Sequence, residues 1–195
     1  MITVDSYFGD KIQQALLNEI GMAKISIHIA VAWFTDMVLF EALMEKQTKG
    51  ISIQLCVVND QINFKPGGIT FTNLNSNNSE FTAVDSNKMH HKFCVIDDSI
   101  VITGSNNWTF RAAHSRKDEN IIVTTGDSEL AQKFTEEFYK VVGKPPTKSV
   151  VSDLSRIIRR IKALQSLIQL EEIDDIHKQA VRLQNEAGND QMVKG

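Results

Sequence analysis

Strand and helix patterns alternate along the first sixty residues, and this alternation restricts the possible folds more than any other feature of the chain. Apolar runs rich in β-branched residues occupy residues 2–8, 24–34 and 51–60. Between these runs, residues 10–22 and 36–49 carry apolar side chains at helical spacing, and Thr35 or Asp36 is available to cap the second helix. The order strand, helix, strand, helix, strand is typical of an α/β domain with a largely parallel sheet.

The chain from residue 61 to residue 142 is expected to complete the same domain. Residues 61–88 are rich in Gly, Pro, Asn and Ser and are expected to form loops, with one short strand at 68–74. Three more strands and then a helix are predicted, at residues 90–97, 99–107, 121–125 and 128–142. These elements indicate an α/β fold with a mixed, largely parallel central sheet flanked by helices.

The remainder of the chain is expected to be a helical extension. The Gly-Lys-Pro-Pro stretch that begins at Gly143 cannot continue a helix and predicts a linker. An apolar seam with alternating spacings of four and three residues follows, formed by Leu154, Ile157, Ile161, Leu164 and Ile168. The seam predicts a helix that docks on a second copy of the chain, on a partner protein or on the domain itself. The predicted boundaries of the α/β domain, linker, helical extension and disordered tail are 1–142, 143–149, 150–187 and 188–195.

Charge and composition exclude several classes of protein. The net charge is −3 and the pI is near 6.0, so any contact with nucleic acid must come from a local basic patch. Acidic and basic residues balance over 150–195, which argues against binding to anionic lipid. The sequence shows no signal-peptide pattern and no apolar run of about 18 residues, which predicts a cytoplasmic protein without membrane contact. Cys56 and Cys94 lie in apolar runs and are expected to be small buried hydrophobes.

Two pairs of polar residues, spaced alike in consecutive predicted strands, indicate the chemistry of the chain. His90 and Lys92 are two residues apart, and so are Ser105 and Asn107. Residues i and i+2 of a strand share a face, so an imidazole, an ammonium, a hydroxyl and an amide are expected to converge. The last three can donate hydrogen bonds to phosphate oxygens, and the imidazole can attack phosphorus or transfer a proton. Because no carboxylates are grouped there, we expect a phosphoryl-transfer site that needs no metal and no other cofactor.

Six residues of this region follow the spacing HxK-x4-D-x6-GSxN, and they are His90, Lys92, Asp97, Gly104, Ser105 and Asn107. In this spacing the chain resembles the phospholipase D superfamily, and in particular the single-motif members of its bacterial nuclease-like branch. The resemblance extends to the strand-helix unit at 24–43 and to the Asp-Glu-Asn stretch at 118–120, and covers about residues 1–142. The mitochondria-linked branch carries an N-terminal membrane segment and a Cys-His zinc element, and the sequence shows neither.

The resemblance implies a role for each of the four polar side chains. His90 would be the nucleophile and would form a covalent phosphohistidine intermediate. Lys92, Ser105 and Asn107 would hold the non-bridging oxygens of the phosphate. A second histidine is needed to protonate the leaving oxygen and then to activate water. Since the chain has one copy of the motif, the resemblance implies a homodimer in which the two His90 side chains face each other in one composite site.

Other residues in and near the motif have implied roles too. Glu119 would accept a hydrogen bond from the far nitrogen of His90 and fix its tautomer, with Asp118 as the competing candidate. Asp97 and Gly104 are expected to be structural, since Asp97 has the opposite strand parity to His90.

Further basic and aromatic residues are considered for contact with the substrate. A locally basic loop follows the motif and is a candidate substrate-binding segment, through Arg111, His114, Arg116 and Lys117. Four aromatic residues are expected mainly in the core, with one of them free to stack a base, and they are Trp33, Phe34, Trp108 and Phe110. His28 is expected in the core, and His91 in a packing or surface role on the opposite strand face from His90.

Three functions are open to such a chain. The first is a metal-independent nuclease that hydrolyses phosphodiester bonds of DNA or RNA, which the resemblance to short single-motif members favours. The second is a phospholipase or cardiolipin-type lipid phosphodiesterase, disfavoured because the sequence shows no membrane anchor and no broad basic face. The third is a catalytically latent interaction module, disfavoured because each motif residue is intact. By analogy, the helical extension suggests the effector part of a restriction or phage-defence system whose activity waits for a partner.

Overall fold

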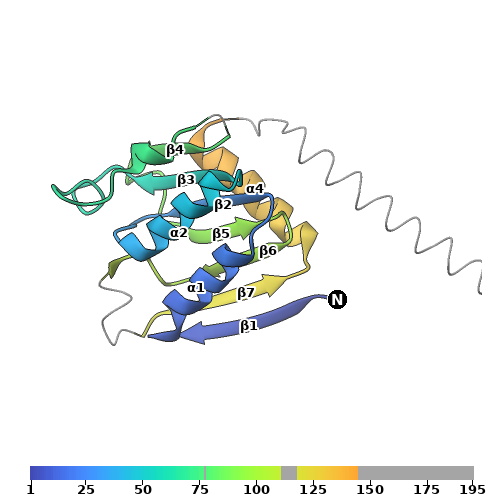
Figure 1. The fold of residues 1–195 in the computed structure, drawn as a ribbon. Coiled ribbons are helices and arrows are strands. Elements are labelled where there is room, and N and C mark those ends of the chain that lie inside the picture. The colour runs from blue at the N-terminus through green and yellow to red at the C-terminus, as the bar shows by residue number, and fades with distance from the viewer. Residues whose placement is uncertain (77, 111–117, 145–195) are drawn as a thin grey trace, which may run out of the picture. The chain divides into compact units, whose positions relative to one another are not determined.

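In the described part of the chain, seven strands form one open sheet with helices on both of its faces (Figure 1). The computed structural model describes residues 1–76, 78–110 and 118–144. The elements are β1 (Thr3–Phe8), α1 (Lys11–Met22), β2 (Ser26–Val31), α2 (Met37–Thr48), β3 (Ser52–Val58), the 3-10 helix η1 (Phe71–Leu74), β4 (Glu80–Val84), β5 (Lys92–Ile96), β6 (Ile100–Gly104), β7 (Asn120–Thr125) and α4 (Ser128–Val142). The chain divides into two units, Met1–Thr147 and Lys148–Gly195. The predicted helical extension, the tail, most of the linker and the basic loop 111–117 lie outside the described residues.

The strand order is β1-β7-β6-β5-β2-β3-β4. Among the described strands, β2 and β3 and then β3 and β4 pair in parallel, and the other neighbours pair antiparallel. The prediction of a mixed sheet flanked by helices is confirmed, but the expectation that the sheet is largely parallel is wrong. The parallel part is confined to the segments joined by crossovers, whereas β5, β6 and β7 follow one another as an antiparallel meander.

Two elements between residues 61 and 88 differ from the sequence prediction. Residues 68–74 are expected to form a strand but contain the 3-10 helix η1 instead. Phe71 and Leu74 of η1 are buried in the core. The strand β4 was not expected, because its sequence follows a polar run and its side chains are half-buried or exposed. β4 is an edge strand that pairs with β3 on one side, so it needs little of the apolar character that marks a central strand.

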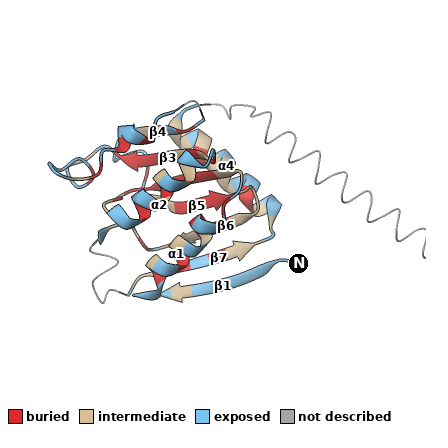
Figure 2. Cartoon of the chain, viewed as in Figure 1, coloured by how far each residue is buried: buried red, intermediate tan, exposed pale blue. Residues whose placement is uncertain are grey.

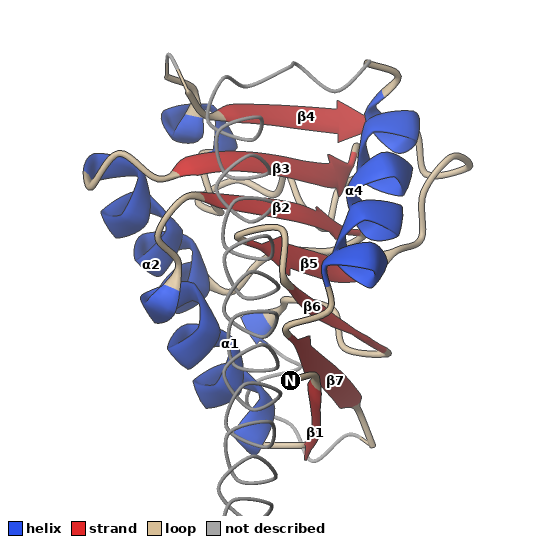
Figure 3. Ribbon diagram, turned by 90° about the vertical axis from the view of Figure 1, so that its right-hand side faces the viewer, coloured by secondary structure: helices blue, strands red, loops and turns tan. Residues whose placement is uncertain are grey.

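The core lies in two layers, one on each face of the sheet. α1 and α2 cover one face and α4 covers the other, as Figure 3 shows. Successive residues of β2 divide between the layers, with Ile29 packing in the cluster of α1 and α2 and Ala30 in the cluster of α4. The central strands β2, β3 and β5 are accordingly buried, while β1 is exposed at the edge (Figure 2).

The two cysteines occupy opposite layers of this core. Cys56 packs in the α4 layer and Cys94 in the layer of α1 and α2, and both are free thiols. Burial raises the pKa of the Cys56 thiol to about 12 and raises the pKa of Cys94 as well. Both thiols therefore act as small apolar groups, as the surrounding sequence predicts.

Local signals in the sequence account for the start of α2 and for both ends of α4. Asp36 caps α2, and its carboxylate accepts hydrogen bonds from the backbone N–H groups of Val38 and Leu39. α4 begins after Asp127, which caps it in the same way, and ends at Gly143 in the left-handed conformation (φ 68°). No helix in the ranges that the structure describes is long and apolar enough to cross a bilayer.

Several strands end or begin along one side of the sheet, at the ends of the strands and not along an outer strand, and we call this side the site edge. Because β5 runs antiparallel to β2 and β6, and β7 runs antiparallel to β6 and β1, the strands β1, β2, β3 and β6 end there while β5 and β7 begin there. Segments far apart in the sequence therefore meet at this edge, just before β5 and β7 and just after β2, β3 and β6.

Candidate active site

The predicted site residues lie at the site edge, in the loops that flank the strands. His90 precedes β5, which begins at Lys92. Ser105 and Asn107 follow β6, which ends at Gly104, so the expectation that the strands extend over His90 and Asn107 is wrong. Since β5 begins where β6 ends, these side chains still come from neighbouring segments of the chain.

His90 and Lys92 form the first pair of contacts in the site. The Nζ of Lys92 lies 3.3 Å from Nδ1 of the His90 ring and donates a hydrogen bond to the His90 carbonyl oxygen at 3.0 Å. His90 is exposed and Lys92 is half-buried. Burial lowers the pKa of Lys92, and the negative charge of Glu119 acts in the opposite direction. The imidazole is thus open to a substrate, with a cation held beside it.

Ser105 and Glu119 form the second pair. The Ser105 hydroxyl donates to Oε2 of Glu119 at 2.5 Å and accepts from the backbone N–H of Asn120 at 3.1 Å. The resemblance implied that Glu119 would bond to His90; among the described residues its carboxylate accepts from Ser105 and acts on Lys92 through its charge. Glu119 thus contacts the Ser105 hydroxyl through a hydrogen bond and acts on the Lys92 ammonium through its charge, and Lys92 in turn contacts the imidazole.

Gly104 is what allows β6 and β7 to come this close. A Cβ atom on Gly104 would lie 2.1 Å from the carbonyl oxygen of Asn120 and 2.8 Å from the Cα of Ile121. The backbone pair between Ser105 and Asn120, with an N–H to oxygen distance of 3.1 Å, follows directly after this contact. The motif therefore needs a glycine at this position for a steric reason: without a side chain, β6 lies close enough to β7 for Ser105 to reach Glu119, which precedes β7.

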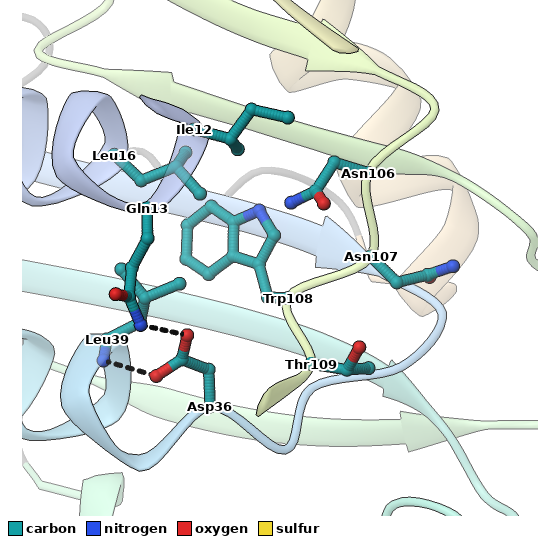
Figure 4. A pocket seen from close by; sticks show the side chains of 9 residues that line it. All are labelled: Ile12, Gln13, Leu16, Asp36, Leu39, Asn106, Asn107, Trp108 and Thr109. Atoms are coloured by element: carbon teal, nitrogen blue, oxygen red, sulfur yellow. Dashed lines mark hydrogen bonds between the residues drawn. The ribbon is translucent and has the colours of Figure 1, made fainter. Parts of the chain in front are cut away.

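Asn107 is held by the segment that follows β2. Its Oδ1 accepts a hydrogen bond from the backbone N–H of Trp33 at 3.3 Å. The next residue, Trp108, accepts from the backbone N–H of Thr35 at 2.8 Å and inserts its ring into the core beside Leu16. Figure 4 shows this anchoring, with the Trp108 ring among the side chains that line the pocket and the Asn107 side chain directed away from that ring. The buried tryptophan thereby fixes the backbone that presents Asn107.

Asp97 lies at the opposite end of β5 from the other motif residues. Its carboxylate accepts hydrogen bonds from the backbone N–H groups of Lys24, Ile25 and Ser26, at 2.8 to 3.0 Å. Asp97 and Asp98 both have positive φ (52° and 50°) and are the central residues of the turn between β5 and β6, which is closed by a hydrogen bond from the backbone N–H of Ser99 to the carbonyl oxygen of Ile96. Asp97 therefore ties the hairpin turn to the start of β2 and does not contact the site.

The remaining candidates divide between site and core. Trp108 is buried in the core, whereas Phe110 is 60% exposed. His91 points to the α4 face, where its Nε2 lies 3.2 Å from Oε1 of Glu137. His28 is buried against Phe138 of α4. The substrate-contact roles predicted for Arg111, His114, Arg116 and Lys117 fall outside the described residues, and Asp118 is exposed.

Sequence reasoning missed the place of Trp33 and the role of Asp60. The Trp33 ring is half-buried and stands edge-on to His90, with centroids 5.9 Å apart and an interplanar angle of 88°. Its indole N–H donates to Oδ2 of Asp60 at 2.7 Å. A signal was present, since each residue lies two positions after the end of a buried strand, and both strands end at the site edge.

Comparison with known proteins gives relatives in sequence. Residues 16–142 match the family model described as "Cardiolipin synthase, PLD-like domain". The mitochondrial cardiolipin hydrolase of Xenopus laevis is 32% identical over 130 residues, which is 65% of this chain and 59% of that protein. The protein of the same description from Danio rerio is 29% identical over 129 residues, 65% and 55% of the two chains. A phospholipase D of Rickettsia conorii is 31% identical over 127 residues, 63% and 60%. The chain thus spans less than two thirds of the length of each relative.

Two solved structures share the fold over nearly their whole length. NucT from Helicobacter pylori superimposes with a TM-score of 0.63 at 23% identity, over 74% of this chain and 98% of NucT. Nuc from Salmonella typhimurium, a phospholipase D family member, superimposes with a TM-score of 0.64 at 21% identity, over 74% and 96%. Together with the family match over residues 16–142, the fold and the spacing from His90 to Asn107 show that this chain belongs to the phospholipase D superfamily, a family of phosphodiesterases.

Proposed function

We propose that this chain is a nuclease that hydrolyses phosphodiester bonds of nucleic acid through a phosphohistidine intermediate and without a metal ion. The observation that carries the proposal is the exposed imidazole of His90, with Nζ of Lys92 at 3.3 Å and the Ser105–Glu119 pair at the same edge of the sheet. A nucleophile, a cation and a hydroxyl donor are the parts that displacement at a phosphate requires.

In the first step a ring nitrogen of His90 attacks phosphorus, a P–N bond forms and the P–O bond to the leaving group breaks. Lys92, Ser105 and Asn107 hold the non-bridging oxygens as charge develops on them. When the Ser105 hydroxyl turns to donate its hydrogen bond to a phosphate oxygen, the Glu119 carboxylate loses its present donor. Glu119 is then available to accept a hydrogen bond from the imidazole. Glu119 then stabilises the positive charge that the ring acquires on attack.

In the second step water attacks phosphorus and the P–N bond breaks, which regenerates His90. A general acid must protonate the leaving oxygen in the first step, and the same group then removes a proton from water. We assign this role to His90 of a second copy of the chain, in a homodimer with one composite site.

Aromatic side chains beside the site support nucleic acid as the substrate. Trp33 is half-buried next to His90, and Phe110 is exposed three residues after Asn107. Rings at the mouth of a site provide stacking surfaces for unpaired bases, whatever their sequence. The second candidate function is a lipid phosphodiesterase, which the names of the zebrafish and Xenopus relatives favour.

The test uses the purified full chain with single- and double-stranded DNA and RNA and with cardiolipin vesicles, each in excess EDTA. We expect cleavage of nucleic acid that resists EDTA and falls by roughly 10³-fold or more in His90→Ala. His91→Ala is the matched control, because His91 faces α4 and Glu137, so this variant is expected to keep its activity. Cleavage of cardiolipin alone would favour the second function, and cleavage that EDTA abolishes would contradict the proposed mechanism.

A further inference from the structure

Trp33 lies against the proposed nucleophile, although the motif does not include it. It follows β2 at the site edge, and its ring meets the His90 ring edge-on at a centroid distance of 5.9 Å and an angle of 88°. Nζ of Lys92 lies 3.3 Å from Nδ1 of the same imidazole. The exposed ring of His90 thus has one aromatic neighbour and one cationic neighbour to limit its rotation.

The tryptophan itself is fixed at its side chain and at its backbone. The indole N–H donates to Oδ2 of Asp60 at 2.7 Å, and the backbone N–H donates to Oδ1 of Asn107 at 3.3 Å. The residue before it, Ala32, donates its backbone N–H to the carbonyl oxygen of His91 at 2.9 Å. The end of β2 is therefore bonded both to the residue after the nucleophile and to a phosphate-binding candidate.

Asp60 is held in place by the loop that follows β3. Its other oxygen, Oδ1, accepts from the backbone N–H groups of Ile62 and Asn63, at 3.0 and 3.1 Å. The Asn63 side chain is 1% exposed, donates to the carbonyl oxygens of Ala32 and Val58 at 2.7 Å each, and accepts from the backbone N–H of Phe34 at 2.8 Å. Asn63 thus locks the residues on both sides of Trp33, and the indole cannot turn without breaking its bond to Asp60.

We propose that Trp33, oriented by Asp60, is a positioning residue that sets the direction of the His90 imidazole. The proposal rests on the proposed function, in which a His90 nitrogen must face phosphorus. His90 lies in a loop and is exposed, so its own element does not define its rotamer. A nucleophile displaced by about 1 Å loses on the order of 100-fold in rate, so an aromatic wall that excludes the wrong rotamers contributes directly to turnover.

Two substitutions break the same bond in different ways. Trp33→Phe keeps an aromatic ring but removes the N–H donor. Asp60→Asn keeps an oxygen for Ile62 and Asn63 but can place an amide NH₂ against the indole N–H, where two donors face each other. We expect each variant to lower kcat about tenfold with little change in KM, and the double variant to lose no more than either single one, because residues acting through one interaction are not additive.

Further variants separate positioning from general damage. Trp33→Ala removes the wall and is expected to lower kcat by roughly 100-fold. Phe64→Ala is the matched control, because Phe64 lies in the same loop as Asp60 but packs on Phe71 and Phe81. It is expected to keep the kcat of the parent chain.

A second readout does not depend on catalysis. In chains labelled with ¹⁵N-histidine, His90→Ala identifies the His90 signals among the five histidines. We expect the ¹⁵N shifts of the His90 ring and its tautomer ratio to change in Trp33→Phe and Asp60→Asn, while the His28 and His91 signals stay. If the parent chain cleaves no phosphodiester at all, the proposed function fails, and these signals still decide the positioning role. Unchanged His90 signals, or additive losses of kcat in the double variant, would overturn the positioning role of Trp33.

Discussion

Gly104 shows how one side chain, or its absence, decides the geometry of the site. A methyl group there would overlap the carbonyl oxygen of Asn120 at 2.1 Å, so Gly104→Ala must push β6 away from β7. We expect a loss of about 1–3 kcal/mol in the free energy of unfolding, as in other overpacked sites, together with a lower kcat because Ser105 and Glu119 separate. Urea unfolding and the nuclease assay measure the two effects.

Gly21→Ala is the matched control for this substitution. Gly21 lies within α1, and a Cβ atom there would meet nothing within 4 Å. Alanine is the better helix former, so this variant is expected to gain roughly 0.5–1 kcal/mol in stability and to keep its activity. Equal behaviour of the two glycine variants would show that the close approach of β6 and β7 is not required.

At the scale of residues, the sequence predicts which side chains gather but not how they pair. The spacing from His90 to Asn107 places four polar groups at neighbouring strand ends, and the structure brings those ends together. The bond from Ser105 to Glu119 and the contact of Trp33 with His90 could not be predicted, because each depends on a rotamer and on a segment distant in sequence.

At the scale of elements, periodicity predicts helices and buried strands well but says nothing of strand direction. The helix α4 runs from Ser128 to Val142, as its apolar spacing and its terminal glycine indicate. The antiparallel direction of β5 and β6 follows from the Asp97–Asp98 turn, whose two residues adopt positive φ. Asp is among the residues that tolerate positive φ, so the Asp-Asp pair indicates a tight turn and hence antiparallel strands. The alternation of helices and strands earlier in the chain suggested a parallel sheet instead.

The packing of α4 on β2 contains a buried histidine, which makes the stability of this contact depend on pH. His28 of β2 meets both Phe138 and Tyr139 edge-on, and its Nε2 is 3.3 Å from the Tyr139 hydroxyl. Nδ1 of His28 is buried and has no hydrogen-bond partner among the described residues. Burial lowers the pKa of His28, against a smaller opposing effect of the Asp98 charge.

A lowered pKa in the folded state means that the unfolded chain binds the His28 proton first as the pH falls. Below the unfolded pKa of about 6.5 the free energy of unfolding should therefore decrease, by at most about 1.4 kcal/mol per pH unit for this one group. Leucine has no proton to bind, so the stability of His28→Leu relative to the parent chain should rise as the pH falls from 7.5 to 5.5. Urea unfolding at both pH values measures this difference.

Tyr139→Phe serves as the control for the His28 variant. It removes the hydroxyl that faces Nε2 but leaves the buried imidazole, so it should retain the pH dependence of the parent chain. A parent chain whose stability changes with pH no more steeply than that of His28→Leu would contradict a buried, neutral His28.

At the scale of the whole molecule, one chain supplies half of the groups that the proposed mechanism needs. The described residues bring one nucleophile, one lysine and one Ser105–Glu119 pair to the site edge. The single motif is readable from sequence, whereas the surface that would join two copies is not, because it depends on exposed side chains that obey no periodicity. The predicted homodimer therefore needs a test that counts histidines per site.

Mixing parent chain with His90→Ala provides this count. If each composite site needs His90 from both copies, random exchange of subunits at equal amounts leaves roughly one quarter of the dimers fully intact, so the activity of the original parent chain falls to about half. At three parts of variant to one of parent it falls to about one quarter. Sites that work within one chain would keep the full activity at every ratio. An inert carrier in the unmixed sample holds the total protein concentration constant. A loss of activity that follows the fraction of parent chain then comes from sites shared between two copies. Light scattering on the same samples checks that the particles are dimers.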